Sequence, residues 1–421
     1  MAKLKIIPRD FYLQQLIDCQ ENGLIKIISG VRRCGKSFLL FELFQRHLLG
    51  QGVKKSHIIT HRFDDPAEAS FSSAEDFFQY IKQKIKDKQT YYLLLDEIQL
   101  LPNFEKALNG FLYRKNLDVY VTGSNARFLV SDVITEFRGR SYEIRVFPLS
   151  LAEFYTAQKL SWPEAVDAYL NYGGMPQILS FSQEQMKINY LRKLVQETYL
   201  RDIIERYKIR NDGELAEVFQ VMASNVGGLT NPTRLAHTFS SVKKISLSTS
   251  TIERYLQYFE NAFLLQKVIR YDIKGKKYIN TPAKYYFVDP GLRNACLAFR
   301  QTEIPHLLEN VVYTDLVRRG YQVDVGLVRV LERTPQATYS RRDAEVDLVA
   351  SMASKRYYIQ VAMVMPTADK ITQEKRSLRA INDVFRQIIV MRDQTTMPYQ
   401  DEDGILMIGL RDFILHPEMW E

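Results

Sequence analysis

The chain has 421 residues, of which 46% are hydrophobic and 25% are charged. This composition is typical of a globular protein and excludes extensive disorder. The length predicts two to four domains of about 100–200 residues each. No apolar run approaches the roughly 18 residues of a membrane span, and the opening segment MAKLKIIPRDFYLQQL lacks a signal-peptide core. We therefore expect a cytoplasmic protein without membrane contact. Cys19, Cys34 and Cys296 are far apart and form no C-x-x-C pair, so neither a disulfide framework nor a zinc site is predicted.

Positive charge is concentrated in one part of the chain. The formal net charge is +8, and residues 201–300 contain sixteen Lys and Arg against nine Asp and Glu, so this segment alone carries +7. A localised basic segment is typical of a nucleic-acid interface. The alternative is a surface of solvated lysines, which is the commoner origin of a modest charge excess.

The first motif is the segment LIKIISGVRRCGKSFLL, residues 24–40. An apolar run predicts a buried strand, Gly30 opens a turn, and a helix is expected to begin near Gly35. The spacing of Gly30, four residues and Gly35-Lys36-Ser37 predicts a phosphate-binding loop. Its backbone N–H groups and helix N-terminus bind phosphates, Lys36 reaches the outer phosphates, and the Ser37 hydroxyl binds Mg²⁺. The other nucleotide-binding residues that we expect flank these positions: Arg32, Arg33 and Phe38.

A helix is expected near residues 10–21, a strand over 57–63 and a helix over 74–86. The segment YYLLLDEIQLL, residues 91–101, then predicts a buried parallel strand with two carboxylates at its C-terminal end. Asp96 is expected to hold Mg²⁺, directly or through water, and Glu97 to orient and polarise the attacking water. An apolar strand can also end in Asp-Glu by chance.

After a predicted helix over 103–114, the segment DVYVTGSN, residues 118–125, resembles the sensor strand of AAA-type ATPases. Ser124 or Asn125 is expected near the terminal phosphate and the attacking water, although an ordinary strand-to-loop turn has the same residues. Arg138 and Arg140 flank a glycine and are candidate arginine fingers, acting within the chain or on a neighbouring subunit of a homo-oligomer. A solvated basic loop is the alternative.

These motifs together resemble the prokaryotic AAA-type ATP-binding proteins whose ATPase domain is paired with a C-terminal domain of unknown function. The motifs that carry the resemblance are GVRRCGKS (30–37), LDEIQ (95–99), TGSN (122–125), RGR (138–140), FPL (147–149), YGGMP (172–176) and IQVA (359–362). The resemblance implies an ATP-binding module related to origin-recognition and signalling ATPases. It also implies that the helical stretch 151–170 is a small lid. The residues after this stretch predict a long charged helix over 187–207.

The segment 211–300 predicts three short helices and a hairpin, the order of a winged helix-turn-helix. On the third helix, residues 248–261, the side chains expected to face the major groove are those of Ser248, Thr249, Thr251 and Arg254. The wing lysines Lys274, Lys276 and Lys277 are expected to meet phosphate, so double-stranded DNA is a candidate partner through residues 248–277. A packing or dimerisation module with solvated lysines remains the alternative.

Residues 301–421 predict a helix, three strands, a helix and a further strand, which resembles the restriction-endonuclease-like fold. Glu309, Asp347 and Gln360 occupy positions of metal-binding residues in that fold. The position two residues after Gln360 requires a lysine to activate water and holds Ala362 instead. The constellation is therefore incomplete, and we expect a degenerate nuclease fold that contacts DNA or protein. The alternatives are an active nuclease, or ordinary exposed acids at Glu309, Glu345 and Asp347.

The predicted fold class is α/β, with a P-loop NTPase parallel sheet and helices on both of its faces. The predicted parts are the ATPase domain (1–150), the helical lid and connecting helix (151–210), the winged helix-turn-helix (211–300) and the nuclease-like domain (301–421). The linker candidates are Gly173-Gly174, Asn211-Asp212-Gly213 and Asp289-Pro290-Gly291. We expect an Mg²⁺-dependent ATPase whose cycle moves the C-terminal half, on DNA or elsewhere. The alternative is a slow-turnover switch that holds ATP or ADP and does not use DNA.

Overall fold

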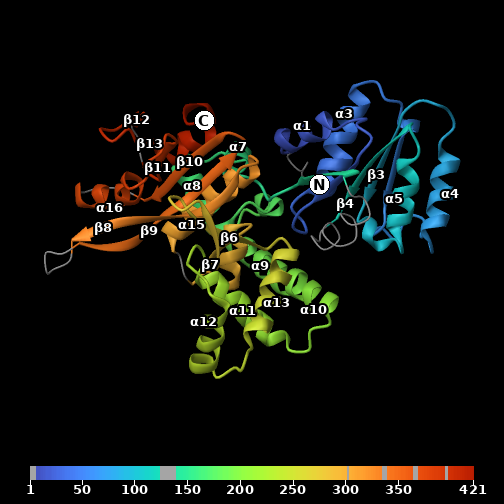
Figure 1. Ribbon diagram of the computed structural model, residues 1–421. Coiled ribbons are helices and arrows are strands. Elements are labelled where there is room, and N and C mark those ends of the chain that lie inside the picture. The colour runs from blue at the N-terminus through green and yellow to red at the C-terminus, as the bar shows by residue number, and fades with distance from the viewer. Residues whose placement is uncertain (1–5, 124–138, 301–302, 334–338, 364–367, 394–396) are drawn as a thin grey trace. The chain divides into compact units, whose positions relative to one another are not determined.

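The computed structural model describes residues 6–123, 139–300, 303–333, 339–363, 368–393 and 397–421 (Figure 1). The chain divides into two compact units. Unit 1 comprises the residues up to Pro148 together with Asn261–Phe263. Unit 2 comprises Leu149–Glu260 and Leu264–Glu421. Within the described ranges, no helix is both long and apolar enough to cross a membrane.

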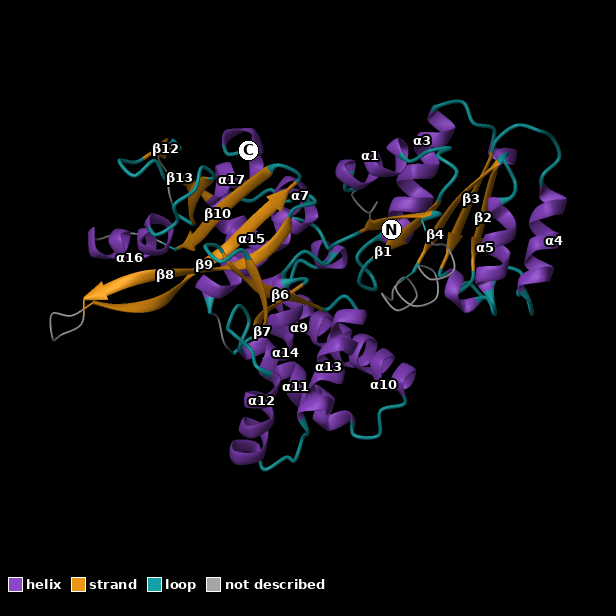
Figure 2. Cartoon of the chain, viewed as in Figure 1, coloured by secondary structure: helices purple, strands orange, loops and turns teal. Residues whose placement is uncertain are grey.

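Unit 1 contains a five-stranded parallel sheet in the order β2-β3-β4-β1-β5 (Figure 2). The strands are β1 (Ile25–Ser29), β2 (Ile58–Arg62), β3 (Tyr91–Asp96), β4 (Leu117–Thr122) and β5 (Ser141–Arg145). The apolar runs of β1 and β3 are buried at every position, as expected of strands that are covered on both faces.

The helices of unit 1 cover both faces of this sheet. They are α1 (Asp10–Asp18), α2 (Lys36–Phe38), a π-helical turn (Leu39–Phe44), α3 (Gln45–Gly50), α4 (Ala74–Lys84) and α5 (Phe104–Leu112). The chain crosses the sheet in one direction from β1 to β2 and in the opposite direction from β2 through β3 to β4. Because such crossovers are right-handed, α3 lies on one face of the sheet and α4 and α5 lie on the other. The predicted P-loop NTPase sheet is confirmed.

Unit 2 contains an eight-stranded mixed sheet in the order β12-β13-β11-β10-β9-β8-β6-β7. Its strands are β6 (Leu265–Asp272), β7 (Lys277–Phe287), β8 (Gln322–Arg333), β9 (Tyr339–Met352), β10 (Lys355–Ala362), β11 (Arg386–Met391), β12 (Tyr399–Gln400) and β13 (Leu406–Gly409). The predicted hairpin is β6 and β7. Strand β6 also pairs in parallel with β8, with Tyr271 opposite Gly326, so the hairpin is continuous with the C-terminal strands.

The helices of unit 2 precede, separate and follow these strands. They are α7 (Leu151–Ala157), α8 (Trp162–Tyr172), α9 (Glu184–Lys193), α10 (Arg201–Tyr207), α11 (Asp212–Ser224), α12 (Pro232–Thr238), α13 (Thr249–Asn261), α14 (Pro290–Cys296), α15 (Ile304–Arg318), α16 (Ala368–Arg379) and α17 (Leu410–Leu415). A π-helical turn, Leu194–Leu200, joins α9 to α10. The expected order of three helices and a hairpin is therefore present as α11, α12, α13, β6 and β7.

The helices α7 and α8 correspond to the stretch for which the resemblance implied a lid. Phe154 on α7 and Tyr169 on α8 are buried in one apolar cluster with Leu308 on α15 and Ile359 on β10. Their apolar faces are thus covered by the C-terminal sheet of unit 2, and these helices share a core with it. Closure of a lid over nucleotide remains a prediction.

Two of the predicted linkers pack against each other. The Asp289 carboxylate is buried and accepts hydrogen bonds from Gly174 N (2.6 Å) and Leu292 N (3.0 Å), the second of which caps α14. A Cβ on Gly173 would lie 2.0 Å from Asp289 Oδ1, and one on Gly291 would lie 2.1 Å from Tyr172 O. These glycines allow a close contact between α8 and α14, so neither break separates two domains.

Replacement of Asp289 with Asn should make the stability of unit 2 less dependent on pH. Burial raises the pKa of Asp289 to about 6, although hydrogen bonds from backbone N–H groups oppose the rise. Because this folded-state pKa is above that of the unfolded chain, the carboxyl stabilises the fold most below pH 4, and this contribution is lost as the pH rises toward 6. The free energy of unfolding of the Asn variant should therefore fall furthest below that of wild type near pH 4. The difference should shift in favour of the variant by up to about 3 kcal/mol by pH 7.

Tryptophan fluorescence in urea measures this effect in unit 2, because the chain's two tryptophans, Trp162 and Trp420, both belong to it. Asp343→Asn, at an exposed carboxylate, is the control. A difference between Asp289→Asn and wild type that stays constant from pH 4 to 7 would contradict the assignment.

Candidate functional site

The predicted phosphate-binding loop connects β1 to α2 and depends on two glycines. Gly30 has φ +138°, and a Cβ at this position would lie 2.1 Å from Val146 O. Gly35 has φ +104° and directly precedes Lys36, where the helix begins. A residue with a side chain would be strained at these φ values, and its Cβ would not fit at Gly30. The two glycines therefore allow the backbone to form this tight loop.

Lys36 closes the loop from inside. Its side chain is buried, and Nζ donates to Gly30 O (3.0 Å) and Val31 O (3.2 Å). An ammonium group has three donors, so among the described residues these contacts use two and leave a third for a phosphate oxygen. The residues therefore fit a nucleotide phosphate.

Arg9, which the sequence did not suggest, anchors the loop from the segment before α1. Its buried guanidinium donates from Nη1 to Cys34 O (3.2 Å) and from Nη2 to Phe147 O (2.7 Å). Cys34 Sγ also contacts Val146 O (3.3 Å). The loop is thus tied to the segment after β5 by two contacts, Arg9 with Phe147 and Cys34 with Val146, each between residues more than 100 positions apart in the sequence.

The two acidic residues of the second motif lie at the carboxyl end of β3, beside Thr122 at the end of β4. Thr122 pairs with Ile28 of β1, and its Oγ1 donates to the buried Asp96 carboxylate and accepts from Glu97 N (3.0 Å). Glu97 has φ +50°, and its carboxylate accepts a hydrogen bond from Gln99 Nε2. The strand register therefore brings the phosphate loop and both carboxylates to one edge of the sheet.

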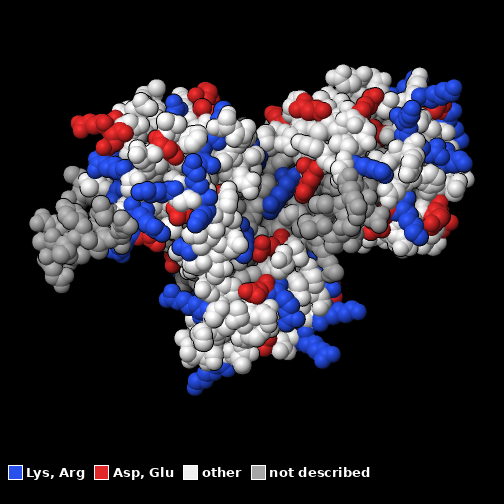
Figure 3. Space-filling model, viewed as in Figure 1, with Lys and Arg blue, Asp and Glu red and all other residues white. Residues whose placement is uncertain are grey.

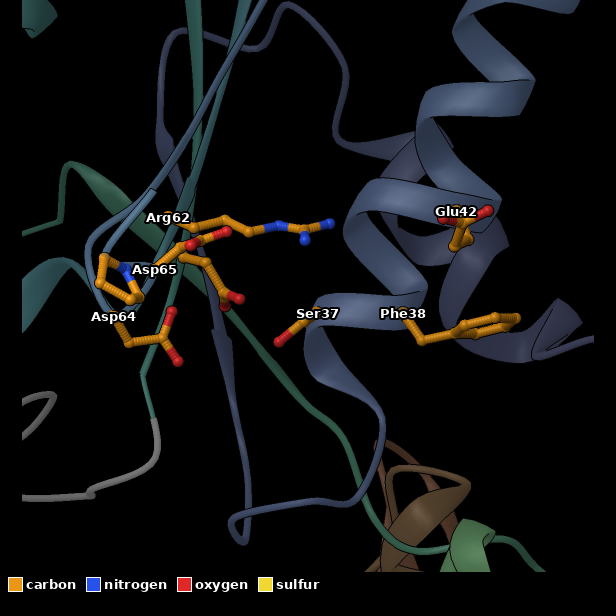
Figure 4. A pocket seen from close by; sticks show the side chains of 8 residues that line it. Ser37, Phe38, Glu42, Arg62, Asp64 and Asp65 are labelled. Atoms are coloured by element: carbon orange, nitrogen blue, oxygen red, sulfur yellow. The ribbon is translucent and has the colours of Figure 1, made fainter. Parts of the chain in front are cut away.

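A cavity of about 530 Å³ lies at this edge (Figure 4). It is lined by Ser37, Phe38, Glu42, Arg62, Asp64, Asp65, Pro66 and Asp96. Of the predicted residues, the cavity brings together Ser37, Phe38 and Asp96. Arg62, Asp64 and Asp65 were not predicted as site residues. The signal that points to them is a turn sequence directly after β2, since the carboxyl ends of parallel strands meet at one edge.

The other predicted arginines lie elsewhere. Arg32 and Arg33 are exposed in the phosphate loop. Arg140 precedes β5, and Ile25 N at the start of β1 donates to Arg140 O (3.0 Å). Because β1 and β5 are parallel, Arg140 lies at the end of the sheet where these strands begin. The length of β1, about 15 Å, separates it from the phosphate loop. The structure therefore does not bring Arg140 to its own loop. The predicted Ser124, Asn125 and Arg138 lie outside the described residues.

Magnesium usually keeps several waters and binds through one or two carboxylates and substrate phosphates. The predicted Mg²⁺ ligands are one carboxylate, Asp96, and one hydroxyl, Ser37, and both line the same cavity. Among the described residues, no group of three or more His, Cys, Asp and Glu side chains could hold a metal ion by itself.

A second polar cluster lies in unit 2, where the restriction-endonuclease resemblance placed Glu309, Asp347 and Gln360. Asp347 N donates to Gln360 Oε1 (2.7 Å), and Val361 N donates to Asp347 Oδ2 (2.9 Å). The lysine missing at Ala362 has a counterpart from β7. Lys284 Nζ lies 2.7 Å from Glu309 Oε1 and 2.6 Å from Glu345 Oε1.

The charges of this cluster depend on one another. Burial alone would lower the pKa of Lys284, but the carboxylates of Glu309, Glu345 and Asp347 raise it above its usual value. Burial would raise the pKa of Glu309, but the Lys284 ammonium and hydrogen bonds from neighbouring side chains hold it below its usual range. Burial and the negative charge of Glu309 raise the pKa of Asp347 well above its usual value. Lys284 therefore balances buried negative charge.

Two family models match the chain. One described as "AAA domain" matches residues 22–155, and one described as "Domain of unknown function (DUF8612)" matches residues 163–303. An uncharacterized protein of Haemophilus influenzae is 35% identical over 419 residues, which are 97% of this chain and 99% of the relative. Uncharacterized protein MJ1544 of Methanocaldococcus jannaschii is 26% identical over 394 residues, which are 91% of this chain and 83% of the relative.

Solved structures show more distant similarity. The Walker-type ATPase PABY2304 of Pyrococcus abyssi is 15% identical, with a TM-score of 0.49, and the match covers 69% of this chain and 96% of that chain. The Aeropyrum pernix ORC1 protein, solved in complex with DNA, is 10% identical, with a TM-score of 0.32 and coverage of 69% and 92%.

Replacement of Lys284 with Met should destabilise unit 2 by about 3–5 kcal/mol, because it leaves the buried Glu309 carboxylate without its cation. Urea unfolding followed by tryptophan fluorescence measures the loss in unit 2. Lys355→Met, at an exposed lysine of the same sheet, should change the free energy of unfolding by less than about 0.5 kcal/mol. Equal effects of the two substitutions would show that Lys284 does not neutralise a buried charge.

Proposed function

This chain belongs to the family of its Haemophilus influenzae relative, a family of AAA-domain proteins with a C-terminal domain of unknown function, and we propose that it binds and hydrolyses ATP with Mg²⁺. One observation carries the proposal. Thr122 joins the strand of the phosphate loop to Asp96 and Glu97, so the phosphate loop and both acidic residues lie at the same end of the sheet, an arrangement that supports ATP hydrolysis.

Each of these residues has a role in the proposed reaction. The loop N–H groups and Lys36 bind the phosphates, and the Ser37 hydroxyl and Asp96 hold Mg²⁺ directly or through water. Glu97 orients the attacking water and accepts its proton. The nucleotide would supply the phosphoanhydride bond, and the metal ion held by Ser37 and Asp96 would supply positive charge that stabilises the phosphate oxygens.

A slow-turnover nucleotide switch is the second candidate. It is supported by the hydrogen bond from Gln99 to Glu97, which occupies the carboxylate proposed to polarise water. It is also supported by Arg140, which lies at the far edge of the sheet from its own phosphate loop. A role for Arg140 then requires a second subunit. Steady-state turnover with and without duplex DNA, together with the solution mass, separates the switch from a DNA-stimulated or oligomeric ATPase.

Replacement of Lys36 with Ala should abolish ATP and ADP binding, because the loop loses its only interior cation among the described residues. Glu97→Gln should retain nucleotide binding and lose about 10²–10⁴-fold in turnover, because the amide cannot accept the proton of water. Fluorescent-nucleotide titration and phosphate release measure the two effects. Lys55→Ala, at an exposed lysine of unit 1, is the control. Normal hydrolysis by the Lys36 variant would contradict the site assignment.

Double-stranded DNA is the partner that we propose for unit 2, and the supporting feature is the exposed basic hairpin turn. Lys274, Lys276 and Lys277 are exposed and form no ion pair with any residue that the structure describes. Ser248 Oγ accepts from Thr251 N (3.1 Å), so this hydroxyl caps α13 as well as facing solvent. On the face that Figure 3 shows, Lys and Arg around α10–α13 are scattered among uncharged surface and some Asp and Glu. Phosphate contacts, rather than one basic strip, are the expected mode.

Binding of a duplex should weaken steeply with salt, and Ala at Lys274, Lys276 and Lys277 together should reduce the slope of log K against log salt by up to about 3. Fluorescence anisotropy with a labelled duplex measures both slopes. Ala at Lys187 and Lys193, which lie on α9, is the matched control. Absence of duplex binding at low salt would remove the DNA proposal and leave the ATP proposal intact.

For the nuclease-like cluster, we propose a structural role without metal-dependent cleavage. The Lys284 ammonium contacts Glu309 and Glu345, and the N–H of Val361 donates to the Asp347 carboxylate, so groups of the protein itself stabilise the negative charge of the cluster. Ala362 supplies no cation of its own. This reading agrees with a degenerate nuclease fold, in which a lysine ammonium takes the place of a bound cation.

A further inference from the structure

Arg62 ends β2 at the sheet edge that carries the proposed nucleotide site. It pairs in register with Asp96 of β3, and Phe63 N donates to Asp96 O (3.1 Å). Arg62 N itself donates to Glu68 Oε2 (3.1 Å). The backbone of Arg62 is therefore fixed on both sides, directly beside the carboxylate proposed to hold Mg²⁺.

The side chain of Arg62 extends into the cavity toward the helix that carries Ser37 (Figure 4). Its guanidinium carbon lies 4.6 Å from the ring centroid of Phe41 on the same helix. Stacking on a ring holds the guanidinium plane and leaves its N–H donors directed outward.

Four carboxylates, those of Glu42, Asp64, Asp65 and Asp96, line the same cavity. Arg62 nevertheless forms no ion pair with any residue that the structure describes. Of these carboxylates, Asp96 is engaged by Thr122 and Glu42 by Arg46. A positioned, exposed guanidinium that is not neutralised by the cavity is suited to an anionic ligand, and a phosphate group accepts its parallel N–H donors.

We propose that Arg62 binds the terminal phosphate of the nucleotide from within the same chain. The inference rests on the proposed ATP site and adds a cation that the sequence sought in Arg138 and Arg140. It assigns Arg62 a direct contact with substrate. As the bond to the leaving ADP breaks and water adds, the transferred phosphoryl group carries negative charge spread over its three equatorial oxygens, and a guanidinium at that position stabilises this charge.

Arg62→Ala tests the proposal through the difference between ATP and ADP, since only ATP has the terminal phosphate. Affinity for a non-hydrolysable ATP analogue should fall about 10–100-fold, the range for a lost charged hydrogen bond, while ADP affinity stays within about 2-fold. The turnover number should fall by at least the same factor. Arg62→Lys should recover part of the ATP affinity, because lysine keeps the charge without the paired donors.

Arg114→Ala is the matched control, because the guanidinium carbon of Arg114 also lies over a ring of unit 1, 5.2 Å from the ring centroid of Phe78, and Arg114 does not line the cavity. It should leave both affinities unchanged. Unchanged ATP affinity in Arg62→Ala, or equal losses for ATP and ADP, would overturn the proposal. Because Lys36→Ala tests nucleotide binding separately, a wild-type protein that binds no nucleotide would instead overturn the proposed function.

Discussion

The candidate site of unit 1 depends on the register of β4 between β1 and β3. Thr122 lies opposite Ile28, the second-last residue of β1, and β1 leads into the phosphate loop. The Thr122 hydroxyl also forms hydrogen bonds with the side chain of Asp96 and the backbone N–H of Glu97. A slip of one residue would turn Thr122 to the other face of the sheet and separate the acidic motif from its partner. The hydroxyl is buried, so loss of this side chain would leave the Asp96 carboxylate and Glu97 N without a partner that they now have.

The sequence predicted the phosphate loop and the acidic motif because their signals are local. Gly30 and Gly35 are required by the backbone φ of a short loop, and Asp96 and Glu97 follow an apolar run that forms β3. Arg62 has equally local surroundings, a strand end and a turn, but its meaning depends on β2 lying beside β3. That neighbourhood is a property of the sheet order, which the chain order does not reveal. Arg9 escapes prediction for a similar reason, since its two partners, Cys34 and Phe147, lie far apart in the sequence and only the fold brings them together.

The predicted parts of unit 2 were less well separated in the structure than in the sequence. Glycine and proline mark changes of chain direction, and they do so whether the turn is exposed or buried. At Gly173 and Gly291 the missing side chains permit close packing against Asp289 and Tyr172, so the same residues that suggested linkers form an internal contact. The sequence predicted one helical stretch over 151–170, which the structure divides into α7 and α8, and it carried no information about which sheet covers their apolar faces.

The Lys284 cluster shows that a motif can lack its lysine at the expected spacing while a lysine from another strand supplies the positive charge. Ala362 and Gln360 are two residues apart on β10, where a restriction-endonuclease-like site would place its lysine, whereas Lys284 comes from β7. Because Lys284 contacts Glu309 on α15 and Glu345 on β9, the ion pairs join the hairpin to the C-terminal half, and the pairing of β6 with β8 joins them a second time. Helices α11–α13 lead into this hairpin. The hairpin that follows these helices is therefore joined to the C-terminal strands by both a continuous sheet and a buried ionic contact, because Lys284 and the pairing of β6 with β8 act at different points of the hairpin.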